Sequence, residues 1–139
     1  MQSSSVRVLV VEDFAPIREF ICSTLTKMPN LQVICEVSDG QEAVQKAEEL
    51  KPDLVLLDIG LPTLHGIEAA RLIRKLAPES KIIFVTAESS PDLVQAAFSL
   101  GAWGYVAKSR SASDLLAAVE AVLEGRQFVS SGLIAGGPG

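Results

Sequence analysis

Five polar side chains lie at the ends of four short apolar stretches, and their types suggest binding of both a cation and an anion. They are Glu12, Asp13, Asp58, Thr86 and Lys108. Short runs rich in Val, Ile and Leu are typical of buried parallel strands. The carboxyl ends of such strands meet at one edge of the sheet, where open α/β sheets bind ligands. We therefore expect a cation site next to an anion site at this edge.

The charges of these side chains favour a divalent cation. Three carboxylates and one ammonium group leave two negative charges unbalanced. Like charges in a small cleft raise one another's pKa unless a cation lies among them. Ligands that are all oxygen favour Mg²⁺ over softer metals. The alternative is that the acids only cap helices, as Asp13 could do for the helix after it. Three acids opposite Lys108 and Thr86 argue against that alternative.

Asp58 is the candidate nucleophile. It follows four apolar residues, 54–57, so its carboxylate would be held rigidly and partly desolvated. A carboxylate can attack phosphorus to give an acyl phosphate. Lys108 would then pair with a phosphoryl oxygen, and the Thr86 hydroxyl could donate a hydrogen bond to another. Taken alone, Thr86 could be an ordinary strand residue and Lys108 a solvated strand end, but their joint placement supports the phosphoryl site.

Five alternations of strand and helix patterns would position these residues. We expect strands at 6–11, 31–37, 54–58, 81–86 and 105–107, and helices that begin near residues 15, 39, 67, 90 and 111. Asp39 and Ser90 are predicted caps, and Ser111 with Asp114 forms a capping-box pattern. Right-handed crossovers leave few topologies. We predict an α/β fold with a five-stranded parallel sheet, a doubly wound three-layer sandwich in the flavodoxin-like strand order 2-1-3-4-5.

The length and composition are typical of one globular domain. The chain has 139 residues, of which 48% are hydrophobic and 21% charged. We expect a disordered lead-in at 1–5, the domain at 6–128 and a linker-like, glycine-rich tail at 129–139, with no output domain in this chain.

Several function classes are disfavoured. The net charge of −5 argues against nucleic-acid binding by this chain. No apolar run approaches the roughly 20 residues that span a membrane, and the N-terminus lacks a signal-peptide pattern, so we expect a cytoplasmic protein. There is no G-x-G-x-x-G after the first strand and no P-loop lysine motif, which disfavours a nucleotide-binding module. His65 is expected to be a solvated loop residue rather than a phosphodonor.

Taken in order along the chain, these motifs resemble the receiver (CheY-like phosphoacceptor) domain of two-component response regulators. The resemblance covers about residues 6–128. The matching residues are the acid pair Glu12 and Asp13, the strand that ends at Asp58, the loop with Pro62 and Gly66, Thr86 with Ala87, and Tyr105 with Lys108. The stretches 101–108 and 125–129 resemble the branch that carries a LuxR-type helix-turn-helix output.

The resemblance implies a phosphorylation-dependent signalling switch. A sensor histidine kinase or a phosphotransfer protein would transfer a phosphoryl group from phosphohistidine to Asp58. Asp13, Asp58 and the carbonyl of Gly60 would ligate Mg²⁺ directly, and Glu12 would act through a bound water. Pro62 and Gly66 would shape the loop beside the site. The residues at positions 60 and 88, here Gly60 and Glu88, would influence the lifetime of the acyl phosphate.

The resemblance also implies a conformational change. The Thr86 hydroxyl, next to Ala87, would be drawn inward, and Tyr105 would rotate from solvent into the cavity behind it. The surface formed by the last two helices and the strand between them would change shape and regulate an output, with transcription as one candidate. Formation of a homodimer on phosphorylation would fit the same branch.

An enzymatic alternative uses similar residues. Phosphohydrolases of the haloacid-dehalogenase type also combine a strand-end Asp nucleophile with Mg²⁺, a Thr or Ser and a Lys. They need a second carboxylate two residues after the nucleophile as general acid and base, and that position is Gly60 here. A degenerate receiver that only binds partners is a further alternative, against which the intact acid set argues. We expect a regulatory phosphoacceptor domain rather than an enzyme.

Overall fold

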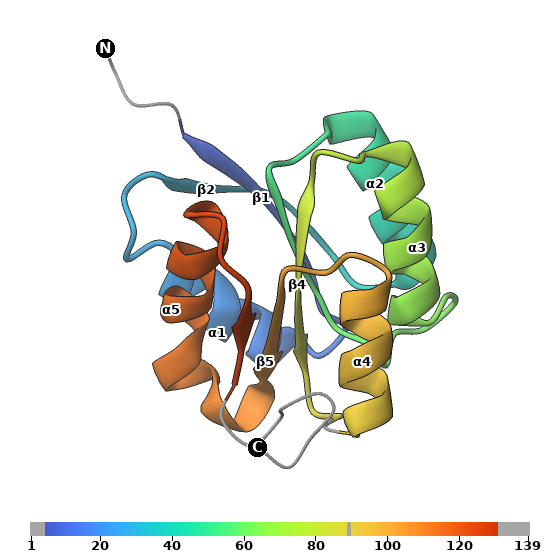
Figure 1. Cartoon of the computed structure of the whole chain (residues 1–139). Helices are drawn as coiled ribbons and strands as arrows, with labels where there is room; N and C mark the ends of the chain where they lie inside the picture. The colour runs from blue at the N-terminus through green and yellow to red at the C-terminus, as the bar shows by residue number, and fades with distance from the viewer. Residues whose placement is uncertain (1–4, 89, 131–139) are drawn as a thin grey trace.

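A parallel β-sheet lies between two layers of helices (Figure 1). The computed structural model describes residues 5–88 and 90–130. The strands are β1 Val6–Val11, β2 Leu31–Val37, β3 Leu54–Leu57, β4 Lys81–Thr86, β5 Gly104–Ala107 and β6 Phe128–Val129. The helices are α1 Ala15–Leu25, α2 Gly40–Leu50, α3 Gly66–Leu76, α4 Pro91–Ser99 and α5 Ser111–Leu123, with a short 3₁₀ turn at Lys108–Arg110.

The sheet has six strands in the order β2-β1-β3-β4-β5-β6, and every neighbouring pair is parallel. The α/β class and the order of the first five strands agree with the sequence prediction, but the predicted count of five was wrong. The additional strand β6 has two residues and pairs with the outer edge of β5. A two-residue segment carries no period-2 pattern, so the apolar pattern of the sequence could not reveal it.

Apolar residues fill both spaces between the sheet and the helices. α1 and α5 pack on one face, and α2, α3 and α4 pack on the other (Figure 1). The central strands face a helix layer on both sides, and all four residues of β3 are at most 1% exposed. This explains why the strands are continuous apolar runs rather than alternating patterns.

Most helix starts follow the local sequence signals. Asp39 caps α2 by accepting a hydrogen bond from the Glu42 amide at 2.8 Å, and the Ser90 hydroxyl caps α4. The predicted capping box at Ser111 was wrong, because α5 begins without a side-chain cap. Asp13 likewise does not cap α1, whose N-cap residue is Phe14.

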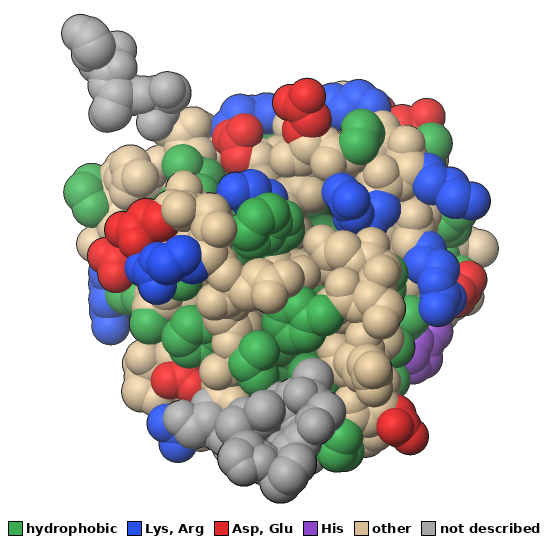
Figure 2. All heavy atoms as spheres, viewed as in Figure 1, with side chains coloured by type: hydrophobic (Ala, Val, Ile, Leu, Met, Phe, Trp, Pro, Cys, Tyr) green, Lys and Arg blue, Asp and Glu red, His purple; other side chains and the backbone are tan. Residues whose placement is uncertain are grey.

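The ends of the chain are only partly covered by the structure. The predicted lead-in at 1–5 and tail at 129–139 lie largely outside the described residues, which begin at Ser5 and end at Ser130. Val129 belongs to β6. None of the helices in the described part of the chain has the length and apolar character needed to span a bilayer. On the face shown in Figure 2, acidic and basic side chains are interspersed around a mostly uncharged centre.

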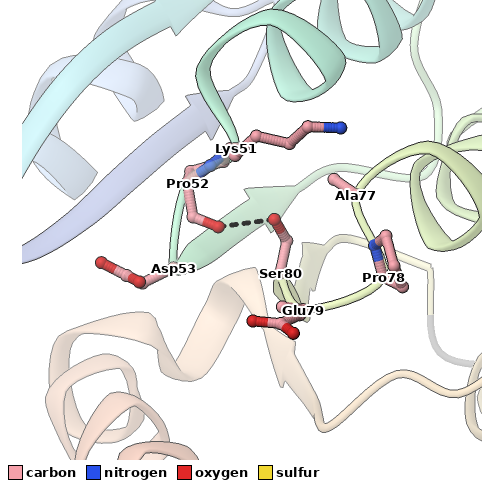
Figure 3. Close-up of a pocket in the computed structure, with 7 residues that line it drawn as sticks. All are labelled: Lys51, Pro52, Asp53, Ala77, Pro78, Glu79 and Ser80. Carbon is pink, nitrogen blue, oxygen red and sulfur yellow. Dashed lines mark hydrogen bonds between the residues drawn. The ribbon is translucent and has the colours of Figure 1, made fainter.

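A hollow of about 400 Å³ lies at the amino edge of the sheet, where the chain enters β3 and β4 (Figure 3). Its lining residues are Lys51, Pro52, Asp53, Ala77, Pro78, Glu79 and Ser80. The Ser80 hydroxyl donates to the Pro52 carbonyl, and the Lys51 amine donates to the Leu76 carbonyl. These bonds join two loops across the hollow, on the edge of the sheet opposite to Asp58 and Thr86.

Candidate functional site

The three predicted acids converge at the carboxyl edge of the sheet. Val11 at the end of β1 is the register partner of Leu57 at the end of β3, so the residues that follow them are neighbours. One carboxylate oxygen from each of Glu12, Asp13 and Asp58 lies within 4.8 Å of the others. Glu12 and Asp58 are 1% and 6% exposed, whereas Asp13 is exposed to solvent. The cluster therefore has two buried acids and one accessible acid.

Lys108 reaches this cluster from the connection between β5 and α5. Its Nζ lies 2.8 Å from Glu12 Oε1 and 3.1 Å from Asp58 Oδ2. Burial alone would lower the pKa of Lys108, but hydrogen bonds and charge from Glu12 and Asp58 outweigh burial and raise it. Lys108 is therefore held as an ammonium ion against the candidate nucleophile.

Glu12 is the most desolvated acid of the cluster. Burial raises its pKa, although the ammonium of Lys108 and the amide of Phe14 partly compensate. Glu12 Oε2 accepts a hydrogen bond from the Phe14 amide at 3.0 Å. Glu12 Oε1 lies 2.8 Å from the Lys108 ammonium, which supplies positive charge to this buried oxygen. A buried oxygen of this kind requires compensation by a positive charge or a donor.

The donor set fits a divalent cation. It consists of carboxylate oxygens only, and three carboxylates with one ammonium group leave an excess of negative charge. These are the properties of sites for hard cations such as Mg²⁺. The acidic cluster can therefore hold a metal ion.

The loop after β3 is shaped by close backbone contacts. The Ile59 amide donates to Asp58 Oδ1 at 2.8 Å, which orients the carboxylate. Gly66 passes so close to this turn that a Cβ atom would lie 2.2 Å from the Asp58 carbonyl oxygen. The Pro62 carbonyl accepts the Gly40 amide, which joins the loop to α2. Gly60 is exposed, and a Cβ atom there would lie 3.5 Å from Glu88 Oε2.

Thr63 is a feature of this loop that the sequence analysis missed. It has a φ of +64°, a left-handed conformation that β-branched residues rarely adopt. Its hydroxyl donates to Asp39 Oδ1 and accepts from the Gln41 amide, both at 3.2 Å. These bonds offset the backbone strain and fix the loop to the start of α2. The loop sequence gives no sign of this conformation, because glycine is the residue that usually indicates it.

Thr86 and Tyr105 are linked by hydrogen bonds to the backbone of Glu88, which follows Ala87 in the segment after β4. Thr86 is buried, and its Oγ1 accepts the Glu88 amide at 3.1 Å. The Tyr105 ring is fully buried, and its hydroxyl donates to the Glu88 carbonyl at 2.9 Å. Ala87, which lies between Thr86 and Glu88 in the sequence, is exposed. The structure thus gives Tyr105 the inward orientation, and the rotation from solvent stays a prediction.

A doubly wound parallel sheet with three acids and a lysine at its carboxyl edge defines a class of phosphoacceptor-like α/β domains. Residues 8–120 match the family described as the response regulator receiver domain. The match covers more than half of the chain, and the chain belongs to this family.

Individual relatives support the same assignment. The chain is 34% identical over 125 residues to the response regulator GacA of Pseudomonas viridiflava, covering 90% of this chain and 58% of that protein. It is 43% identical over 116 residues to the transcriptional regulatory protein PdtaR of Mycobacterium tuberculosis, covering 82% and 55%. A solved structure of a LuxR-family response regulator from Aurantimonas superposes with a TM-score of 0.88 at 35% identity, covering 94% and 93%.

Two conclusions follow from these comparisons. The chain is a response regulator receiver domain of the two-component type, and the comparisons give no support to the haloacid-dehalogenase alternative. The chain spans somewhat more than half the length of the curated relatives it matches.

The burial of Tyr105 predicts an unusual alkaline titration. Burial, followed by the nearby carboxylates of Glu88 and Asp58, raises the pKa of Tyr105 to about 12. A phenol with a raised pKa stabilises the folded protein below its unfolded value of about 10, and this stability is lost as the pH rises through the folded value. Because Tyr105 is the only tyrosine in the sequence, absorbance at the phenolate band reports it directly.

We expect the phenolate signal of the folded protein to develop near pH 12, and the signal of the urea-unfolded protein to develop near the ordinary value for tyrosine. A folded-state midpoint close to that of the unfolded chain would show that the ring is in solvent.

Proposed function

We propose that Asp58 accepts a phosphoryl group and that Mg²⁺ bound at the acidic cluster is required. The observation that carries this proposal is the buried Asp58 carboxylate, which is oriented by the Ile59 amide and paired with Lys108 beside two further acids. Receiver domains accept the group from a sensor histidine kinase or a phosphotransfer protein, and we propose a donor of this class for the chain.

The reaction is a transfer from a phosphohistidine. An Asp58 carboxylate oxygen attacks phosphorus, the P–N bond to the histidine breaks, and the imidazole leaves with its electron pair. Lys108 then exchanges its contact with Asp58 Oδ2 for one with a phosphoryl oxygen. The buried Thr86 hydroxyl can donate to another oxygen. Mg²⁺ held by Asp13, Asp58 and the Gly60 carbonyl, with Glu12 acting through water, would neutralise negative charge on the phosphoryl group.

The contacts of Glu88 provide a route from the site to the protein surface. The Glu88 amide binds the Thr86 hydroxyl, and the Glu88 carbonyl binds the Tyr105 hydroxyl. A Thr86 hydroxyl drawn toward a phosphoryl oxygen would change its bond to Glu88 and with it the contact that holds Tyr105. Phosphorylation would thereby shift the population of conformers of the segment between β4 and α4. We propose that this shift controls an output such as transcription and promotes a homodimer.

Replacement of the nucleophile tests the proposed site. We expect Asp58→Asn to abolish incorporation of phosphate from acetyl phosphate, while unfolding by urea stays cooperative. The matched control is Asp53→Asn, which changes an exposed acid at the opposite edge of the sheet and should label like the parent. Phosphoprotein gel electrophoresis measures the label. Equal labelling of Asp58→Asn would refute the site, and sustained phosphate release over many turnovers would support a hydrolase instead.

Replacement of the accessible acid tests the metal site. Asp13 lies at the solvent side of the cluster, so Asp13→Asn should leave packing unchanged. We expect its Mg²⁺ dissociation constant to rise at least about tenfold, because a charged oxygen ligand is lost. Isothermal titration calorimetry measures the affinity, with Asp53→Asn as the control. An unchanged affinity would remove Asp13 from the ligand set.

A further inference from the structure

The sixth strand brings the end of the described chain next to β5, the strand that precedes Lys108. The Phe128 amide donates to the Trp103 carbonyl at 3.1 Å, and the Ser130 amide donates to the Tyr105 carbonyl at 3.0 Å. In Figure 1 this red strand runs beside β5. Ser130, the residue after β6, is fully buried. The two described residues of the predicted tail, Val129 and Ser130, are therefore part of the edge of the sheet.

A buried polar junction fastens this strand. The Ser130 hydroxyl donates to Asp114 Oδ2 at 2.8 Å and accepts from the Ala107 amide at 3.0 Å. Asp114, which is 9% exposed, also accepts from Arg110 Nε and from the Ser113 hydroxyl, both at 3.1 Å. A buried carboxylate is stable only when donors surround it, and Asp114 has three. The junction joins β5, the start of α5 and β6.

This junction explains why α5 lacks the predicted capping box. Asp114 would have to turn toward the start of its own helix to complete the box, but its oxygens are bound to Ser130, Ser113 and Arg110. Ser111 instead donates to the Lys108 carbonyl at 2.8 Å. Both residues of the pattern therefore hold the connection between β5 and α5 rather than cap the helix.

The same bonds fix the backbone on either side of Lys108. Ser130 holds the amide of Ala107, the residue before Lys108, and Ser111 holds the carbonyl of Lys108 itself. A lysine side chain is long and flexible, so its reach is set by where its backbone is held. The position of Nζ at 3.1 Å from Asp58 therefore depends on a backbone segment to which Ser130 is bonded.

We propose that Ser130 and Asp114 are positioning residues that couple the docking of β6 to the placement of Lys108. This inference rests on the proposed function, because it assigns Lys108 to the phosphoryl group. Coupling is reciprocal: if docked β6 favours a bound phosphoryl group, a bound phosphoryl group stabilises docked β6 by the same factor. The docking of β6 on β5 thereby depends on whether Asp58 is phosphorylated.

The first test measures the junction in the unmodified protein. We expect Ser130→Ala to speed hydrogen exchange at the Ala107 amide about tenfold or more, because this amide loses its acceptor. We also expect the rate of labelling by acetyl phosphate to fall several-fold. The matched control is Ser113→Ala, which removes another donor to Asp114 without contacting β5. It should leave both quantities within about twofold of the parent. Unchanged exchange at Ala107 in Ser130→Ala would overturn the proposal.

The second test needs no variant of the junction. Beryllofluoride with Mg²⁺, a mimic of the phosphoryl group, should slow exchange at the Ser130 and Ala107 amides of the parent chain several-fold. Asp58→Asn should show no such protection. Binding of beryllofluoride without protection at Ser130 would overturn the coupling while leaving the proposed function intact. Failure to bind at all would count against the proposed function, and the exchange effect of Ser130→Ala would still support or refute the junction.

Discussion

The structure depends on an electrostatic imbalance at one edge of the sheet. Two buried carboxylates and one exposed carboxylate lie together with a single ammonium group, so the cluster retains excess negative charge. Like charges held this close cost folding stability unless a cation balances them. Lys108 pairs with Glu12 and Asp58, and in the proposed reaction the same ammonium binds the incoming phosphoryl group.

The strand order of the fold brings these charged groups together. β1 and β3 are neighbours at the centre of the sheet. Strand pairing alone therefore places Glu12 and Asp58, which follow these strands, close together. Thr86 ends β4 and Lys108 follows β5, the next two strands of the sheet. The loop after β3 is fastened to α2 through Thr63, and the loop after β5 is fastened to β6 through Ser130. The loops that flank the candidate site are thus restrained by contacts with α2 and β6.

Much of this arrangement could be predicted from the sequence, because apolar runs that end in polar residues indicate parallel strands and place those residues at one edge. The α/β class, the first five strands and the convergence of Glu12 and Asp58 follow from that pattern. Three features could not be predicted. β6 is too short to carry a pattern, the left-handed Thr63 has no glycine to indicate it, and Asp114 carries a capping signal that a tertiary contact with Ser130 overrides. Each depends on contacts between segments distant in sequence.

The central claim is that Asp58 carries the phosphoryl group in a metal-dependent acyl phosphate. The most direct measurement is borohydride reduction of the chain after incubation with acetyl phosphate, followed by peptide mapping by mass spectrometry. Borohydride converts an aspartyl phosphate to homoserine, so the modified position can be read from the peptide sequence. We expect homoserine at position 58 in the presence of Mg²⁺ and none after chelation of the metal. Homoserine at another aspartate, phosphate on His65, or modification that is independent of Mg²⁺ would contradict it.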